Sequence, residues 1–320
     1  MTTATSALQT PLTKKRARST QARREAILFY VLVAPWVIGF ILLTLGPMLW
    51  SLYLSFTRWD VLTPPQWIGI DNYKFIFSRD QDFPQALKVT TVFSVISVPL
   101  NLIAALALAI LLNEANKAVG LFRTLFYLPS VVAVVASAVL WRWLLNPEVG
   151  PVNGLLGLFG IKGPVWFVDP NWALPGMILM SVWGVGGQML IFLAGLKGVP
   201  KVLYEAGEID GASRMQRFFQ LTLPMLSSTL FFNLVMGIIG SFQTFGAALV
   251  LSSARAGTPG GPAKSTLFYM LYTYVKTFAE TKVGYGAALS WILFGFILIL
   301  TLVTLRSSTV WVYYESDRKQ

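Results

Sequence analysis

Cysteine and histidine are both missing from this 320-residue chain. Without cysteine there is no disulfide, no thiol nucleophile and no cysteine-ligated metal. Without histidine the chain lacks the commonest general base and the commonest metal ligand. No Gly-x-x-x-x-Gly-Lys segment occurs, so the chain has no Walker-type ATP site of its own. We therefore expect a protein that is not an enzyme, with no catalytic residue, no metal site and no cofactor of its own.

Charged residues are also scarce. They make up 12% of the chain against 55% hydrophobic residues, and the mean hydropathy is +0.63. Soluble domains are about one-quarter charged, so this composition predicts an all-α protein that crosses a membrane several times. The net charge of +11 does not indicate a nucleic-acid partner, because the basic residues gather at the ends of apolar runs and form no stripe interleaved with aromatic residues.

Six apolar runs are each long enough for the ~20 residues that a membrane-spanning helix needs. They cover residues 27–56, 89–112, 124–145, 172–196, 223–252 and 283–305. We predict one six-helix transmembrane domain over residues 27–306, a basic tail over 1–26 and a short tail over 307–320. The first run is too long for the apolar core of a signal peptide and lacks an Ala-x-Ala exit.

The basic residues also predict the orientation of the chain. Fifteen of the 25 lysines and arginines fall in the two tails, in the segment around Lys117 and Arg123, and in the loop around Glu205. Because basic residues accumulate on the cytoplasmic side, we expect both termini and the Glu205 loop in the cytoplasm.

The segment Tyr204–Pro224 is a polar island between two apolar runs. Its charged residues are Glu205, Glu208, Asp210, Arg214 and Arg217. A segment this polar cannot lie in hydrocarbon, where each unpaired polar group costs several kcal/mol. We expect a short helix over 201–210, a turn at Gly211, and a second helix that begins at Ser213 as N-cap and runs to Gln220.

The spacing within this loop resembles the EAA loop of ABC-importer permeases, in which Glu-Ala-Ala, three residues, Gly and nine residues precede Ile-x-Leu-Pro. This chain has Glu205-Ala206-Gly207, three residues, Gly211, nine residues, and then Leu221-Thr222-Leu223-Pro224. The sequence departs from the pattern at Gly207, which loosens the first helix by roughly 1 kcal/mol relative to Ala, and at Leu221. The other interpretation is an ordinary amphipathic loop.

Further segments are similar to the carbohydrate-uptake branch of these permeases, the maltose and glycerol-phosphate transporter type. They are Trp59-Asp60, Gly69-Ile70-Asp71-Asn72-Tyr73, Phe122-Arg123, Tyr127-Leu128-Pro129, Thr258-Pro259-Gly260-Gly261-Pro262 and Gly284-Tyr285-Gly286-Ala287-Ala288. The resemblance implies the type I ABC importer fold in a multi-pass protein of the bacterial plasma (inner) membrane. It also implies a carbohydrate substrate, a second homologous permease in a heterodimer, two ATPase subunits that bind ATP and Mg, and an extracytoplasmic solute-binding protein.

In the family this loop, here residues 197–222, docks into a groove on the ATPase. The resemblance assigns coupling to Glu205, Ala206, Gly207, Asp210 and Gly211. The Glu205 carboxylate can form a charge-assisted bond with an arginine of the ATPase. Asp210 could instead pair locally with Arg214 at i,i+4.

The predicted spans contain almost no ionisable groups. Only Arg142 lies inside one, near its outer end, which argues against a proton-coupled carrier. A self-contained sugar facilitator or channel, needing no ATPase, is the alternative. The sequence does not identify the sugar, and it does not indicate which of the two permeases would bind it.

A sugar site needs aromatic faces and neutral hydrogen-bonding groups. The fourth run offers Ser181, Trp183 and Gln188, and the fifth offers Gly237, Gly240, Ser241 and Thr244, which share one face at 100° per residue while Gln243 points away. Helix packing through small residues explains Gly237, Gly240 and Ser241 equally well. The resemblance favours Trp183, Gln188, Ser241 and Thr244, and the predicted path comprises Ser181, Trp183, Gln188, Gly237, Ser241 and Thr244.

Overall fold

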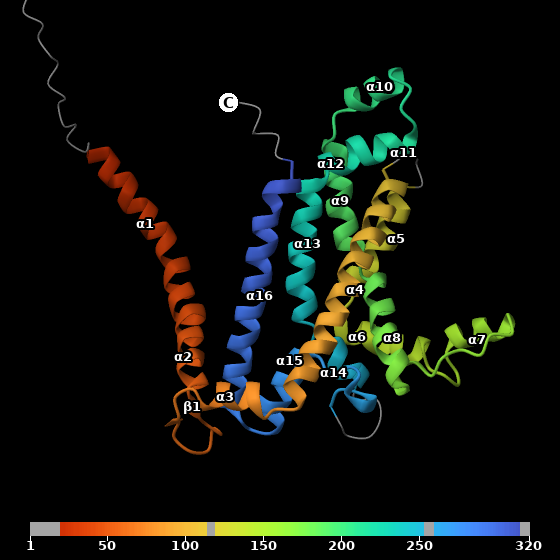
Figure 1. Ribbon diagram of the computed structural model, residues 1–320. Helices are drawn as coiled ribbons and strands as arrows, with labels where there is room; N and C mark the ends of the chain where they lie inside the picture. Colours follow the sequence, from red (N-terminus) through yellow and green to blue (C-terminus); the bar gives the residue numbers. More distant parts are fainter. Residues whose placement is uncertain (1–19, 114–118, 253–258, 314–320) are drawn as a thin grey trace, which may run out of the picture. The chain divides into compact units, whose positions relative to one another are not determined.

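The computed structural model describes residues 20–113, 119–252 and 259–313, and these residues are mostly helical (Figure 1). The basic cluster at Lys14–Arg18, Glu114, Lys117, Thr258 and the end of the C-terminal tail lie outside the described residues. The chain divides into two compact units, residues 1–53 and 54–320.

The first unit is one nearly continuous apolar helix. It consists of α1 (Thr20–Phe40), the π-helical turn η1 (Ile41–Leu45) and most of α2 (Gly46–Ser55). The backbone N–H of Gly46 donates to Ile41 O and so closes the wide turn. Residues Ala22–Ser55 are long and apolar enough to cross a membrane, and an apolar helix without a polar face is typical of a lipid-embedded span.

The second unit begins with the short antiparallel strands β1 (Thr57–Arg58) and β2 (Gln66–Trp67). The elements that follow are α3 (Asp71–Ser78), α4 (Asp82–Leu111), α5 (Val119–Val131), α6 (Val134–Leu144), α7 (Pro151–Leu158), η2 (Trp166–Val168), α8 (Pro170–Trp183), α9 (Gly186–Gly198), α10 (Lys201–Ile209), α11 (Arg214–Arg217), η3 (Phe218–Thr222), α12 (Leu223–Met225), α13 (Ser227–Phe242), α14 (Gly246–Ser252), η4 (Pro262–Lys264), α15 (Tyr269–Tyr274), η5 (Val275–Ala279) and α16 (Val283–Trp311). Helices α4, α9, α13 and α16 form the centre, with α10 and α11 at one end and α3 and α15 at the other (Figure 1).

The described residues contain three unbroken candidate spans and three bent ones, so between three and six spans are long and apolar enough to cross a membrane. Helices α4 and α16 match the second and sixth predicted runs. The third run bends by 101° between α5 and α6, the fourth by 46° between α8 and α9, and the fifth by 66° between α12 and α13. The fifth run breaks again after Phe242, before α14.

Gly186 explains how the α8–α9 break is accommodated. A Cβ atom at this position would lie 2.4 Å from Phe126 O and 2.7 Å from Tyr127 Cα. Because real Cβ atoms do not approach a backbone so closely, only glycine lets the start of α9 pack on α5. The close contact anchors the start of α9 on α5. Further along α9, Met189 and Phe192 are fully buried in an apolar core that α9 shares with α4.

Candidate functional site

The Tyr204–Pro224 loop folds as a helical hairpin. Helix α10 ends at Ile209, Gly211 adopts a left-handed conformation with φ of 74°, and Ser213 caps α11. Gln216 N–H donates to Ser213 Oγ (3.3 Å), and Ser213 N–H donates to Gln216 Oε1 (2.8 Å), so two backbone donors are satisfied reciprocally. The predicted turn and N-cap are confirmed, while the chain beyond Arg217 continues as the π-helical turn η3.

Glu205 lies on an exposed face of α10. Its neighbours on that face are Val202, Ala206 and Ile209, because positions three and four apart coincide on a helix. Val202 is 69% and Ile209 is 87% exposed, and Glu205 and Ala206 are exposed as well. A carboxylate flanked by uncovered apolar side chains fits a protein-docking face better than a merely solvated one.

The opposite face of α10 packs on the second half of the hairpin. Tyr204 Oη lies 2.9 Å from Thr222 Oγ1, and a Cβ atom at Gly207 would touch Arg217 and Leu221 at 3.4 Å. Arg217 forms an ion pair with Glu208. No ion pair joins Asp210 to Arg214 among the described residues. The local pairing that the sequence left open as an alternative is therefore not formed, and Arg217 pairs with Glu208.

A second candidate feature is a cavity of about 480 Å³ in the second unit. Its lining comes from the α5–α6 bend, the end of α8 and the break after α13: Phe93, Pro129, Ser130, Val132, Val134, Ser137, Met177, Met180, Ser181, Trp183, Gly184, Gly240, Gln243, Thr244, Phe245, Gly246 and Ala247. Bent helices therefore surround the cavity, and three residues of the predicted path (Ser181, Trp183, Thr244) meet there.

Two side chains of the cavity have defined orientations. Ser181 Oγ donates to Ile178 O (2.7 Å) and lies 3.3 Å from Asn101 Oδ1 of α4. Trp183 packs edge to face against Trp141, with ring centroids 6.1 Å apart. An indole ring and a hydroxyl group in one cavity are the groups a sugar site uses.

Three other residues of the predicted path lie outside the lining of this cavity. Ser241 is buried and donates to Ser94 Oγ (2.6 Å) of α4. A Cβ atom at Gly237 would lie 3.1 Å from Val98, which is the close helix packing that small residues permit. Gln188 Oε1 is buried without a hydrogen-bond partner among the described residues.

The expectation that Gln243 points away from Thr244 and Gly240 is wrong, since all three line the cavity. Helix α13 ends at Phe242 with Gln243 as its C-cap. Thr244 lies beyond the end of α13, so the spacing of 100° per residue does not hold between Gly240 and Thr244, and apolar periodicity does not reveal this break.

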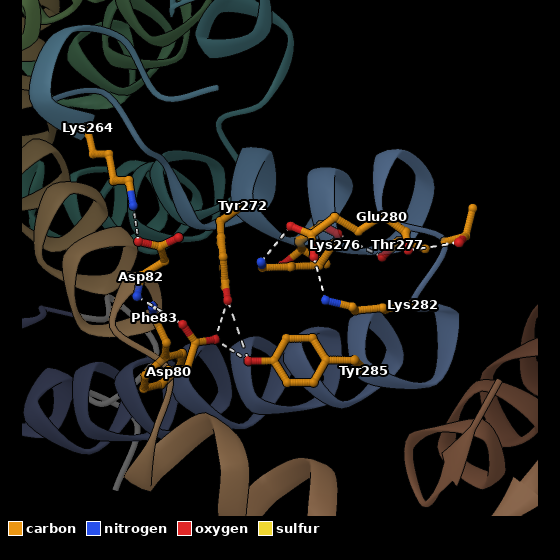
Figure 2. A network of polar contacts seen from close by, with 12 residues as sticks. Asp80, Asp82, Phe83, Lys264, Tyr272, Lys276, Thr277, Glu280, Lys282 and Tyr285 are labelled. Atoms are coloured by element: carbon orange, nitrogen blue, oxygen red, sulfur yellow. Dashed lines mark hydrogen bonds and ion pairs between the residues drawn. The ribbon is translucent and has the colours of Figure 1, made fainter. Parts of the chain in front are cut away.

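The sequence did not single out a polar cluster at the other end of the unit, formed by Asp80, Tyr272 and Tyr285 (Figure 2). Both tyrosine hydroxyls donate to Asp80 Oδ2. The other carboxylate oxygen accepts the N–H groups of Asp82 (2.9 Å) and Phe83 (3.2 Å) at the start of α4. This Asp80 cluster joins α4 to α15 and α16.

Burial raises the pKa of Asp80, but the hydrogen bonds from the two tyrosines and the two backbone N–H groups outweigh it and hold the pKa below its ordinary value. Glu280 nearby follows the same pattern. Burial raises its pKa, but the hydrogen bonds and charges of Lys276 (2.6 Å) and Lys282 (2.7 Å) lower it by more, so the net shift of the pKa is downward. Both carboxylates are therefore held in the charged form at neutral pH.

The Gly69-Ile70-Asp71-Asn72-Tyr73 and Gly284-Tyr285-Gly286-Ala287-Ala288 motifs both contact the backbone around Thr57, next to this cluster. Asn72 Nδ2 donates to Ser55 O and to Thr57 O, both at 2.9 Å. A Cβ atom at Gly284 would lie 2.1 Å from Thr57 O, so this glycine is required for the start of α16 to pass β1. The two motifs are distant in sequence and are joined here.

Comparison with known proteins agrees with this geometry. Residues 116–319 match the family model described as binding-protein-dependent transport system inner membrane component. The chain is 43% identical over 307 residues to the probable ABC transporter permease protein YesP of Bacillus subtilis, covering 95% of this chain and 97% of that protein. It is 32% identical to the trehalose/maltose transport system permease protein MalF of Thermococcus litoralis, covering 88% and 94%.

The fold also has a solved counterpart. A bacterial ABC transporter involved in the import of the acidic polysaccharide alginate superposes with a TM-score of 0.79 at 24% identity, over 92% of this chain and 99% of that one. At that identity the likeness concerns the fold, which is the ABC importer permease fold. The chain thus belongs to the family of binding-protein-dependent transport system inner membrane components, as a permease subunit of an ABC transporter.

Proposed function

We propose that this permease imports a sugar and forms half of the translocation path, with a second homologous permease forming the other half. The relatives support a sugar-type cargo, since they include permeases named for trehalose/maltose, arabinooligosaccharides and sulfoquinovosyl glycerol. Both neutral and anionic cargoes occur among these names. The cavity lined by Ser181, Trp183 and Thr244 is the proposed path, and Trp183 supplies its aromatic face.

The coupling element is the α10–α11 hairpin, and its exposed Glu205 face carries the proposal. The hairpin docks on one of two separate ATPase subunits, which bind ATP and Mg and hydrolyse the ATP. Glu205 bonds an arginine of the ATPase, with Val202 and Ile209 packing on either side. Asp210 and Gly211 form the turn that makes the hairpin narrow enough to enter a groove. A self-contained facilitator would not need this exposed face.

The topology that suits this function has six spans, with each bent helix pair as one span, and both termini in the cytoplasm. The hairpin then faces the ATPases, and α3 and α15 face the extracytoplasmic binding protein. The bias of lysine and arginine toward the tails and the hairpin supports this orientation.

Glu205→Lys tests the coupling. A lysine at this position repels the arginine and leaves the hairpin itself intact, because the Glu205 side chain is exposed and forms no hydrogen bond or ion pair with α11 among the described residues. We expect uptake to be abolished while membrane insertion and co-purification of the second permease stay normal. Glu148→Lys is the matched control, since Glu148 is an exposed glutamate before α7. Normal uptake by Glu205→Lys would refute the coupling role.

A further inference from the structure

A second, larger cavity of about 720 Å³ lies beside the Asp80 cluster. Helix α3, which contributes to its lining, lies at the end of the unit away from the α10–α11 hairpin (Figure 1). Charged and aromatic side chains line it: Arg58, Trp59, Asp60, Phe75, Arg79, Asp80, Asp82, Lys264, Lys276, Glu280, Lys282 and Tyr285 are among its residues. It is distinct from the proposed translocation cavity, with which it shares no lining residue.

The carboxylates of this cavity already have partners. Asp82 forms an ion pair with Lys264, and Glu280 with Lys276 and Lys282. Asp80 accepts the two tyrosine hydroxyls (Figure 2). Asp60 accepts Thr63 Oγ1 (2.8 Å) and the Thr63 N–H (2.9 Å). The three lysines and four carboxylates are thus engaged with one another or with neighbouring donors.

Arg58 and Arg79 are different. Among the described residues neither guanidinium group makes an ion pair or a hydrogen bond, and both side chains are exposed. Both also line an adjoining cavity of about 540 Å³, where Lys74 is paired with Asp71 (3.4 Å). Two guanidinium groups therefore remain as open donors where the two cavities meet, and a planar guanidinium binds carboxylate, sulfonate or phosphate groups through two parallel bonds.

Aromatic rings stand beside these donors. Trp59 and Phe75 line the same cavity, and Phe75 packs edge to face on Tyr285 with centroids 5.8 Å apart. Trp59 is fixed through its backbone, since Trp59 O accepts the Val283 N–H (2.9 Å). Apolar rings for C–H faces beside hydrogen-bond donors are the features of a saccharide site.

We propose that this cavity is a reception site for an anionic saccharide, whose acidic group is bound by Arg58 and Arg79 and whose ring lies against Trp59 or Phe75. The inference rests on the proposed function in that the cargo is a sugar, and it narrows the cargo to one with an acidic group. Because α3 and α15 face the binding protein in the proposed topology, the cavity is the first place on this chain that the delivered sugar meets, ahead of the Trp183 cavity.

The test is calorimetric binding to the purified full chain in phospholipid nanodiscs. The two probes are a uronic-acid disaccharide and the neutral disaccharide of the same linkage, in which a hydroxymethyl group replaces the carboxylate. We expect the acidic probe to bind roughly 10- to 100-fold more tightly, as charged hydrogen bonds to two arginines imply. The difference should shrink as salt is added. Equal affinity for the two probes would overturn the proposal.

Variants locate the binding site. Arg58→Gln with Arg79→Gln should reduce affinity for the acidic probe to that of the neutral one, and Arg58→Lys with Arg79→Lys should give an intermediate affinity. Lys162→Gln removes an exposed charge elsewhere and should bind as wild type. Wild-type affinity in the double glutamine variant would refute the site. So would a double variant that binds both sugars normally and loses only the extracytoplasmic binding protein, because the arginines would then dock a protein.

The two proposals fail separately. Sugar binding in nanodiscs requires no ATPase, so Glu205→Lys should bind the acidic probe as wild type even though it does not transport. Conversely, loss of binding in the arginine variant with ATPase coupling intact would leave the coupling role untouched. An acidic probe that fails to bind would refute the reception site only.

Discussion

Replacing Asp80 with alanine removes the centre of the Asp80 cluster. The change deletes the acceptor for Tyr272 Oη, Tyr285 Oη and the N–H groups of Asp82 and Phe83. Hydrogen bonds to a charged group contribute about 1.5–3 kcal/mol each when buried. Asp80 is partly exposed, which favours the low end. Counting only the two tyrosine bonds at that low end, because water can replace the acceptor of the two backbone N–H groups, we expect the contacts between α4, α15 and α16 to open more readily by roughly 3 kcal/mol.

The interaction energy between Asp80 and one tyrosine can be measured separately, with a double-mutant cycle. Tyr272 is buried to 2% exposure, so its hydroxyl loses a partner that water does not readily replace, although Tyr285 Oη lies 3.5 Å away. In a double-mutant cycle, Asp80→Ala and Tyr272→Phe should be less than additive, with a coupling energy of about 0.5–3 kcal/mol. Asp80→Asn keeps the shape and isolates the contribution of the charge.

Hydrogen exchange of the chain in nanodiscs is the suitable assay, because amide protection reports local opening without complete unfolding. Protection should fall at the start of α4, in α15 and in the first turns of α16, and stay unchanged in α10. Unaltered protection in Asp80→Ala, or strict additivity with Tyr272→Phe, would refute the reasoning.

Acidification should have the same effect as the substitution, and its sign follows from the pKa shift. A carboxyl whose pKa is lowered in the folded state contributes stability above its unfolded pKa of about 4, and this is lost as pH falls through the lowered value. Protection around α15 should therefore fall below pH ~4, and less steeply in Asp80→Asn. Gly186→Ala should destabilise the folded protein by about 1–3 kcal/mol, because the added Cβ atom would lie 2.4 Å from Phe126 O. Gly187→Ala is the control, since a Cβ atom there has nothing within 4 Å. Thermal denaturation should show a lower midpoint for Gly186→Ala only. Ser213→Ala removes the cap of α11 and should reduce the stability of that helix by about 1 kcal/mol. Relative to wild type, hydrogen exchange should become faster at the Gln216 amide and stay unchanged at the Ile209 amide.

The hairpin could be predicted from the sequence because its signals are local. A glycine that permits positive φ and a serine three residues before Gln216 determine the turn and the cap within a few positions. The apolar runs were equally visible. Their length and composition identify candidate spans but carry no information on bending. The breaks near Val132, Val185 and Leu226 were therefore not predicted.

The residues that the sequence did not identify are joined over long separations. Asp80 and Tyr272 are 192 positions apart, and Asp80 and Tyr285 are 205 apart. Nothing in the spacing of a lone aspartate says that two tyrosines will reach it. The same is true of Arg58 and Arg79, whose significance depends on which neighbouring charges are already paired. Ser241 lies on the expected helix but faces Ser94, because packing decides which side of α13 meets the cavity.

The most direct test of the whole account is reconstitution of this chain into liposomes, first alone and then with the proteins that co-purify with it from its native membrane. We expect a second permease and a P-loop ATPase to co-purify. We also expect sugar to enter only when that complex, the binding protein and ATP are all present. Sugar transport by the lone chain without ATP would contradict this expectation and identify the chain as a facilitator.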